Sequence, residues 1–202
     1  MRSATFVLLF ALACVSFAEE EKKLKIGVYY ESLCPDSLRF ITKQLNPSWS
    51  DVSEYVDITF IPFGKSESVK DGEYFRCQHG PEECKGNRIQ SCALDALTDQ
   101  TKEVEFVNCF MTEYNKYSDK DFGEVCIENA GLKVEDVKNC FDSDKGKELQ
   151  LQAEKDTIAI SPKFVPTVVY NEVFDQKLQQ DSMTDFKGTA CKLIKENHPN
   201  AC

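Results

Sequence analysis

The sequence predicts an α/β fold built from a strand–helix–strand unit near the start of the chain and a strand followed by a helix near its end. Three runs rich in β-branched and aromatic residues, at 24–30, 55–62 and 164–170, indicate the strands. Apolar residues with helical spacing follow the first run. The 202 residues, 42% of them hydrophobic, are enough for one globular domain, which we expect over residues 19–202.

The first unit begins with the strand at 24–30, which is apolar enough to be buried. A helix is expected from Pro35, because proline is favoured at the first helical position. Leu38, Ile41 and Leu45 would then share one helical face. The strand at 55–62 completes a βαβ unit, which predicts a parallel pair of strands.

The end of the chain supplies the rest of the sheet. Within the strand at 164–170 we interpret Val165–Pro166 as a candidate cis peptide that faces Cys34; the alternative is an ordinary trans proline at a strand start. A short fourth strand is expected at 172–174 and a closing helix at 183–196. This order of elements is that of a thioredoxin-type fold.

Residues 66–157, between the two halves, are predicted to be a helical insertion and not a separate domain. Val104, Val107, Met111 and Tyr114 have the spacing of one helical face, and residues 146–155 continue a helical pattern. Six of the chain's ten cysteines lie here, so disulfides are expected to brace the insertion.

The N-terminus explains why this chain carries ten cysteines. Arg2 precedes an apolar stretch that is short for a bilayer span, and Ser16 and Ala18 fit a signal-peptidase site, so residues 1–18 are predicted to be a cleaved signal peptide. The alternative, a membrane anchor, is disfavoured by the glutamates at 19–21. We expect no later membrane span. A formal charge of −10 argues against nucleic acid and anionic membranes as partners.

Export to an oxidising compartment predicts that cysteines pair, and nine remain after the signal peptide. The simplest partition is four disulfides and one free thiol, with the pairing left open. Cys34 stands apart from the others along the chain, so we expect it to be free. The remaining eight are disulfide candidates: Cys77, Cys84, Cys92, Cys109, Cys126, Cys140, Cys191 and Cys202.

Cys34 is expected at the surface, where the helix begins after the first strand. A helix N-terminus stabilises the thiolate, the reactive form, so Cys34 is the candidate nucleophile; the alternative is a buried, inert cysteine. Ser37 occupies the position of a resolving thiol in the motif Cys-Pro-Asp-Ser. A hydroxyl can hydrogen-bond to the sulfur but cannot resolve a mixed disulfide, so release needs an external thiol or a thiol of the substrate.

The segment 77–92 contains the densest motif, with three cysteines and His79. These residue types could bind zinc, but the segment has no Cys-x-x-Cys knuckle, so we favour a disulfide-braced loop and expect no metal or cofactor. His79 could act as an acid or base; we favour a ring that caps or bridges loop backbone. His198 is expected to be exposed.

These motifs resemble the GILT family, the gamma-interferon-inducible lysosomal thiol reductases. The resemblance is carried by residues 29–36, Pro62-Phe63-Gly64, the 77–92 segment with its Cys-Gln-His-Gly motif, Gly146, Leu149, Thr157, Pro162 and Val165-Pro166. It implies a thioredoxin-like fold with a helical insertion. It also implies an enzyme that reduces protein disulfides. Such an enzyme would act in the endosomal–lysosomal system or after secretion, and it would be linked to antigen processing or innate immunity.

The chain departs from the family pattern at three places. The family's catalytic pair is Cys-x-x-Cys, which Cys34 matches and Ser37 does not. After the proline the family usually has tryptophan and then Asn-Gly, where this chain has Thr167 and Asn171-Glu172. No Asn-x-Ser/Thr sequon occurs, because proline excludes the one candidate at 46–48, so secretion is at least as expected as glycan-dependent lysosomal sorting.

Two functions follow from these observations. The first is a thiol-disulfide oxidoreductase that acts on disulfide-containing proteins through Cys34, with a small thiol as reductant. The second is a secreted, non-catalytic binding protein on a degenerate reductase scaffold. The odd cysteine count leaves a further alternative open, in which Cys34 forms a lasting intermolecular disulfide and the protein is a dimer in place of a monomer.

Overall fold

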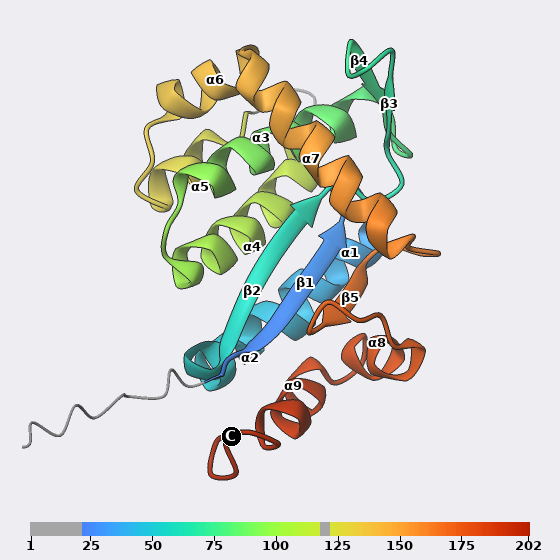
Figure 1. The fold of residues 1–202 in the computed structure, drawn as a ribbon. Coiled ribbons are helices and arrows are strands. Elements are labelled where there is room, and N and C mark those ends of the chain that lie inside the picture. The colour runs from blue at the N-terminus through green and yellow to red at the C-terminus, as the bar shows by residue number, and fades with distance from the viewer. Residues whose placement is uncertain (1–21, 118–121) are drawn as a thin grey trace, which may run out of the picture.

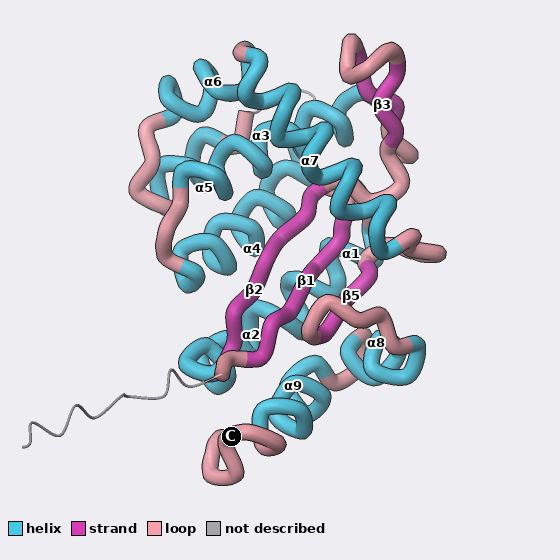
Figure 2. The backbone as a smooth tube through the Cα atoms, in the orientation of Figure 1, coloured by secondary structure: helices cyan, strands magenta, loops and turns pink. Residues whose placement is uncertain are grey.

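The computed structural model describes residues 22–117 and 122–202. The predicted signal peptide, residues 1–18, lies outside the described residues. Helices pack around a mixed three-stranded sheet (Figures 1 and 2). The strands of this sheet are β1, Leu24–Tyr30; β2, Val56–Pro62; and β5, Thr167–Tyr170.

β1 is the central strand, and the strand order is β2-β1-β5. It runs parallel to β2 and antiparallel to β5, so Val28 lies beside Phe60 on one side and beside Val168 on the other. The central position suits this strand because Ile26, Val28 and Tyr30 are buried. The parallel pair of β1 and β2 confirms the predicted βαβ unit.

One continuous helical stretch links β1 to β2 and lies behind the sheet in Figure 1. Pro47 has no N–H to donate, and the N–H of Asn46 bonds to the carbonyl of Ile41, so this hydrogen bond spans one residue more than an α-helical bond. Successive parts of the stretch are α1, Pro35–Phe40; a π-helical turn, Ile41–Leu45; α2, Asn46–Val52; and a 3₁₀ turn, Ser53–Tyr55.

In the described residues between β2 and β5, the chain forms a hairpin and five helices. In Figure 1, α3 to α6 lie to one side of the sheet and α7 crosses its end near the arrowheads of β1 and β2. Both α3 and α7 contact β2. The elements are β3, Glu67–Val69; β4, Tyr74–Arg76; α3, Pro81–Ala96; α4, Gln100–Tyr117; α5, Glu124–Asn129; α6, Val134–Asp142; and α7, Asp144–Ile160.

The helical character predicted for this region is confirmed. Val104, Val107, Met111 and Tyr114 lie on α4, and all four are buried in the main core. The prediction missed the β3–β4 hairpin, because strands of three residues are too short to show a period. Its turn includes Lys70 and Asp71 at positive φ.

The eight cysteines from Cys77 onward form four disulfides. Three of them lie between β2 and β5, and the fourth ties the last helix to the C-terminus. Among the described cysteines, Cys34 is free. The pairs, which the sequence left open, are Cys77–Cys84, Cys92–Cys140, Cys109–Cys126 and Cys191–Cys202.

The C-terminal segment corrects two expectations. Residues 172–174 are not a strand: Asn171 and Glu172 adopt positive φ in a tight turn, and Val173 forms an isolated bridge to Tyr170. The closing helix is α9, Phe186–Ile194, and it is preceded by α8, Gln176–Ser182, which was not predicted. Asp175 and Asp185 cap these two helices with their side chains and so set where each begins.

Glutamine side chains bond to both edges of the sheet. On β5, Gln179 Oε1 accepts from Val168 N at 2.6 Å, and Gln179 Nε2 donates to Pro166 O at 3.0 Å. On β2, Gln100 Oε1 accepts from Ile58 N at 3.0 Å. These bonds satisfy edge groups that would otherwise be unpaired.

No helix in residues 22–117 and 122–202 combines the length and the apolar character that crossing a membrane requires.

Candidate active site

Cys34 lies where β1 gives way to α1. Its N–H donates to Glu31 O at 3.3 Å, which closes a turn after the strand, and Cys34 is the residue that immediately precedes the first helical residue, Pro35. The sequence predicted this position at the helix start. It also predicted surface exposure, which is wrong: Cys34 is 7% exposed. The neighbouring peptide at Val165 accounts for part of this burial.

The backbone before the cis proline lies against the cysteine. The Val165–Pro166 bond is cis, and Cys34 Sγ lies 3.7 Å from Val165 O, a distance suited to a weak S–H donor. The fold thus brings together two segments 131 residues apart in sequence. The structure thus places Cys34 beside the Val165–Pro166 peptide, which the sequence predicted to face it.

Ser37 is fully buried in the first turn of α1. Its Oγ accepts a hydrogen bond from Glu31 N at 3.4 Å. The sequence suggested the sulfur of Cys34 as its partner, whereas the structure gives it the backbone at the end of β1. Ser37 thus supports the turn from which Cys34 projects.

Side chains from α3 and α4 hold the same turn. Asn87 Oδ1 accepts from Ser32 N at 2.9 Å, and Glu83 Oε2 accepts from Leu33 N at 3.3 Å. From α4, Asn115 Nδ2 donates to Ser32 O at 2.8 Å. Each bond satisfies a backbone group that the turn itself leaves unpaired, so the helices after β2 fix the loop that carries Cys34.

The close approach of α3 to this turn depends on a glycine. A Cβ at Gly86 would lie 2.6 Å from the ring of Tyr114 and 2.8 Å from Ser32 Cβ. Any larger residue would therefore push α3 away from the turn.

Next to this turn, two buried carboxyl groups, those of Glu31 and Glu83, contact the imidazole of His79. Glu31 and Glu83 have fully buried side chains, while that of His79 is 37% exposed. His79 Nδ1 lies 2.6 Å from Glu83 Oε2 and 3.5 Å from Glu31 Oε2. The ring therefore pairs with carboxylates, and the expectation that it bonds to loop backbone is wrong.

The surroundings of Glu31 oppose its ionisation. Burial raises the pKa of Glu31 to about 7, and the charge of Glu83 acts in the same direction. The hydrogen bond from Lys65 N, at 2.6 Å, and the charges of His79 and Lys65 act against this rise. In the described residues, the ligand atoms of Glu31, His79 and Glu83 lie within 4.8 Å of one another, which is close enough to share one metal ion.

His198 is remote from these groups in the structure. Its ring lies 5.1 Å from that of Tyr55, between centroids, and its Nε2 lies 3.3 Å from Lys22 O. It is half-buried, which corrects the expectation of an exposed side chain.

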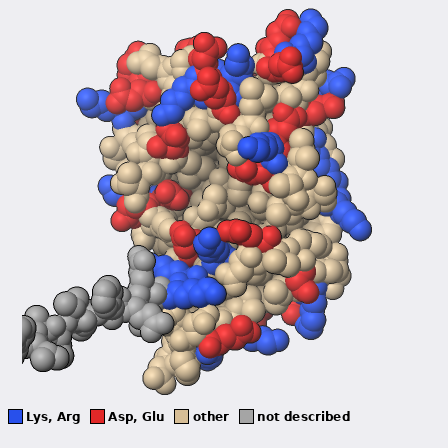
Figure 3. All heavy atoms as spheres, in the orientation of Figure 1, with Lys and Arg blue, Asp and Glu red and all other residues tan. Residues whose placement is uncertain are grey.

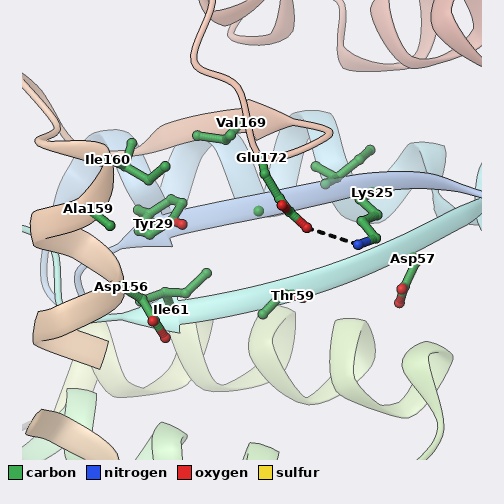
Figure 4. A pocket seen from close by; sticks show the side chains of 12 residues that line it. Lys25, Tyr29, Asp57, Thr59, Ile61, Asp156, Ala159, Ile160, Val169 and Glu172 are labelled. Carbon is green, nitrogen blue, oxygen red and sulfur yellow. Dashed lines mark hydrogen bonds and ion pairs between the residues drawn. The ribbon is translucent and has the colours of Figure 1, made fainter. Parts of the chain in front are cut away.

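A groove of about 570 Å³ lies on the sheet, away from the cysteine. Figure 4 shows Lys25 and Glu172 paired across it, with Tyr29 of β1 and Ile160 at the end of α7 further along the groove. Lys25 Nζ lies 2.9 Å from Glu172 Oε1. Figure 3 shows acidic and basic side chains interspersed over this face of the molecule. Cys34 is not among the residues that line the groove, so the groove is separate from the thiol site.

Known structures share this architecture. The reduced form of DsbG from Mycobacterium tuberculosis matches with a TM-score of 0.60 and 15% identity, over 89% of this chain and 80% of that chain. BdbD from Bacillus subtilis matches with a TM-score of 0.59 and 11% identity, over 88% of each. At such identities the likeness shows the fold alone, and it confirms the thioredoxin-like fold that the sequence predicted.

The fold and a free cysteine against a cis-proline segment define the class of thiol-disulfide oxidoreductases with a thioredoxin-like domain. Residues 25–130 match the family model "Gamma interferon inducible lysosomal thiol reductase (GILT)". The chain belongs to this family. It is 34% identical to "GILT-like protein 1" of Drosophila melanogaster, over 97% of this chain and 85% of that protein. It is 30% identical to the "Gamma-interferon-inducible lysosomal thiol reductase" of Carassius auratus, over 94% and 75%.

Sequence reasoning did not find Glu31, Glu83, Asn87 or Asn115 as parts of the site. Glutamates are seldom fully buried, so neither Glu31 nor Glu83 stood out. One signal was available: His79 and Glu83 are four residues apart at a helix start, a spacing that brings side chains together. Glu31 carries no comparable pattern, because its partners lie about fifty residues further along the chain.

Proposed function

We propose that this protein exchanges disulfides through the single nucleophile Cys34. The observation that carries the proposal is the position of Cys34: it is the free cysteine of the described chain, and its Sγ lies 3.7 Å from Val165 O, beside the cis peptide to Pro166. Membership of a family of thiol reductases supports it. Residues 19–202 would act as one domain, with residues 66–157 inserted.

In the first step, the Cys34 thiolate attacks one sulfur of a substrate disulfide. A bond forms between Cys34 and that sulfur, the substrate S–S bond breaks, and the other sulfur leaves as a thiolate that takes up a proton. Cys34 is oxidised to a mixed disulfide, and one substrate thiol is produced.

Ser37 cannot complete the cycle, because a hydroxyl does not attack a disulfide. A small thiol instead attacks the adduct, frees the second substrate thiol and leaves its own sulfur on Cys34. A second small thiol then restores the Cys34 thiol and departs as part of a small disulfide. Attack by another thiol of the substrate would isomerise its disulfides without net reduction.

Only 7% of Cys34 is exposed, and this favours a second candidate function. A recessed thiol next to Ser37 is compatible with a secreted protein that binds a partner on a degenerate reductase scaffold, without catalysis. We place either activity outside the cell or in the endosomal–lysosomal system, after cleavage of residues 1–18, with a role in protein reduction or innate immunity.

The test is capture of a disulfide-containing peptide by the purified protein between pH 4.5 and 7.5, followed by mass spectrometry. We expect one peptide on Cys34, stable until a small thiol is added, and no adduct on Cys34→Ala. Non-reducing electrophoresis in the same samples separates a monomer from a dimer linked through Cys34. Absence of an adduct on the wild-type protein contradicts the proposal and leaves the binding function.

A further inference from the structure

Three side chains from different parts of the fold lie close together: Glu31, His79 and Glu83. Glu31 follows the last residue of β1, His79 lies in the loop before α3, and Glu83 lies in the first turn of α3. Their ligand atoms lie within 4.8 Å of one another. The thiol chemistry proposed above does not use these three groups.

Backbone N–H groups orient the two carboxylates in the same way. Lys65 N donates to Glu31 Oε1 at 2.6 Å, and His79 N donates to Glu83 Oε1 at 2.9 Å. In each carboxylate the other oxygen, Oε2, is turned towards His79 Nδ1, at 3.5 Å and 2.6 Å. Outer hydrogen bonds that fix carboxylates in this manner are typical of protein metal sites.

Two buried carboxyl groups share one imidazole in this cluster, and the charge of Lys65 also acts on Glu31. No Lys or Arg in the described part of the chain forms an ion pair with Glu31 or Glu83, and His79 contacts both. Glu31 Oε2 is buried without a hydrogen-bond partner. An unpaired buried carboxylate oxygen is costly, so a group that supplies positive charge at this point would stabilise the fold.

The geometry points to a binding site for one divalent transition-metal ion of the Zn²⁺ type, held by Glu31 Oε2, His79 Nδ1 and Glu83 Oε2. One imidazole nitrogen with two carboxylate oxygens suits Zn²⁺, whereas Ca²⁺ and Mg²⁺ prefer oxygen ligands throughout. Bonds of about 2.0–2.2 Å to each ligand put ligand atoms about 3.4 Å apart in tetrahedral geometry. The spacing of His79 from Glu31 already matches, and that from Glu83 widens as the ion replaces the hydrogen bond.

The partial exposure of His79 gives the ion a way in. Three protein ligands leave a fourth position for water or for a ligand atom from solution. Because Glu83 Oε2 also accepts from Leu33 N at 3.3 Å, a bound ion would tie α3 to the turn that carries Cys34. Metal binding would therefore stabilise this turn.

The test is calorimetric titration of the Cys34→Ala protein with Zn²⁺ at pH 7.5, since that variant has no free thiol to compete. We expect one Zn²⁺ per chain and a higher Tm with Zn²⁺. Glu31→Gln and His79→Gln should each weaken binding by more than about 100-fold. Glu83→Gln is avoided because Glu83 also holds Leu33 N, so its loss would confuse metal binding with folding.

Two matched variants serve as controls. His198→Gln removes the other histidine, and Glu103→Gln removes a half-buried glutamate elsewhere; both should bind Zn²⁺ as the parent does. Circular dichroism checks that each variant is folded. Absence of binding in the parent overturns the proposal, and so does binding that survives both Glu31→Gln and His79→Gln.

Discussion

In the mechanism proposed above, one atom of Ser37 decides which reactions are open to Cys34. Cys34 immediately precedes α1, and Ser37 lies in the first turn of this helix, three residues further on. Ser37 is fully buried, and its hydroxyl is engaged by the backbone of Glu31. Ser37→Cys would exchange this oxygen for a sulfur three residues from Cys34, the spacing of a Cys-x-x-Cys pair, with little change in volume.

We expect Ser37→Cys to release mixed disulfides without added thiol. The introduced thiolate attacks the adduct on Cys34, forms an intramolecular disulfide with Cys34 and frees the substrate thiol. Time-resolved mass spectrometry of the peptide adduct measures this release, which should be at least about tenfold faster than in wild type. Ser48→Cys is the matched control, about three turns further along the same helical stretch. Equal adduct lifetimes in the two variants would contradict the expectation.

At the scale of elements, α4 meets the edge of β2 through polar and acidic side chains. Gln100, the first residue of α4, bonds to Ile58 N and to Asp57 Oδ1. Glu103 lies one turn further on. Burial raises the pKa of Glu103 to about 7, and the charges of Asp57 and Asp99 act in the same direction. This contact is therefore most favourable when Glu103 carries a proton.

A carboxyl with a pKa raised by folding binds its proton more tightly in the folded chain. The stability that protonated Glu103 contributes to the fold is therefore fully present below about pH 4.5, and it is lost as the pH rises through about 7. Glu103→Gln should remove this loss, so its free energy of unfolding relative to wild type should rise between pH 4.5 and pH 7.5. Urea unfolding at both pH values measures the difference. Glu105→Gln, at an exposed position, is the control. If the unfolding free energy of both variants changed equally with pH, Glu103 would not be the group responsible.

At the scale of the whole molecule, a disulfide ties each helix that holds the turn of Cys34 to a further helix. Cys92–Cys140 links α3 to α6, which are 48 residues apart at these positions, and Cys109–Cys126 links α4 to α5. The side chains that hold the turn, Asn87 and Asn115, come from α3 and α4. Stability of the helical region and order at the candidate site are thus connected.

Replacing Cys92 and Cys140 together by serine should cost about 4 kcal/mol of unfolding free energy, because the unfolded chain regains a long loop. The same change at Cys191 and Cys202, which close 11 residues, should cost about 3 kcal/mol. Guanidinium unfolding without reductant compares the two. If removal of Cys191–Cys202 cost more unfolding free energy than removal of Cys92–Cys140, native packing, and not the constraint on the unfolded chain, would determine which disulfide stabilises more.

What the sequence could reveal differs between the sheet and the site. Strand runs and Pro35 predict the βαβ unit because they depend on local periodicity and backbone geometry. The lone position of Cys34 predicts a free thiol, yet not its burial, to which Val165, far along the chain, contributes. Glu31 and Glu83 escape prediction for the same reason: their burial exists only once α3 packs on the end of β1.

Gln100 and Gln179 have a consequence for association between chains. Each occupies an N–H on an outer strand, at opposite margins of the sheet. An extended segment of another molecule would have to displace these amides before it could extend the sheet on either side. Intermolecular strand addition, a common start of aggregation, is thereby discouraged at both margins.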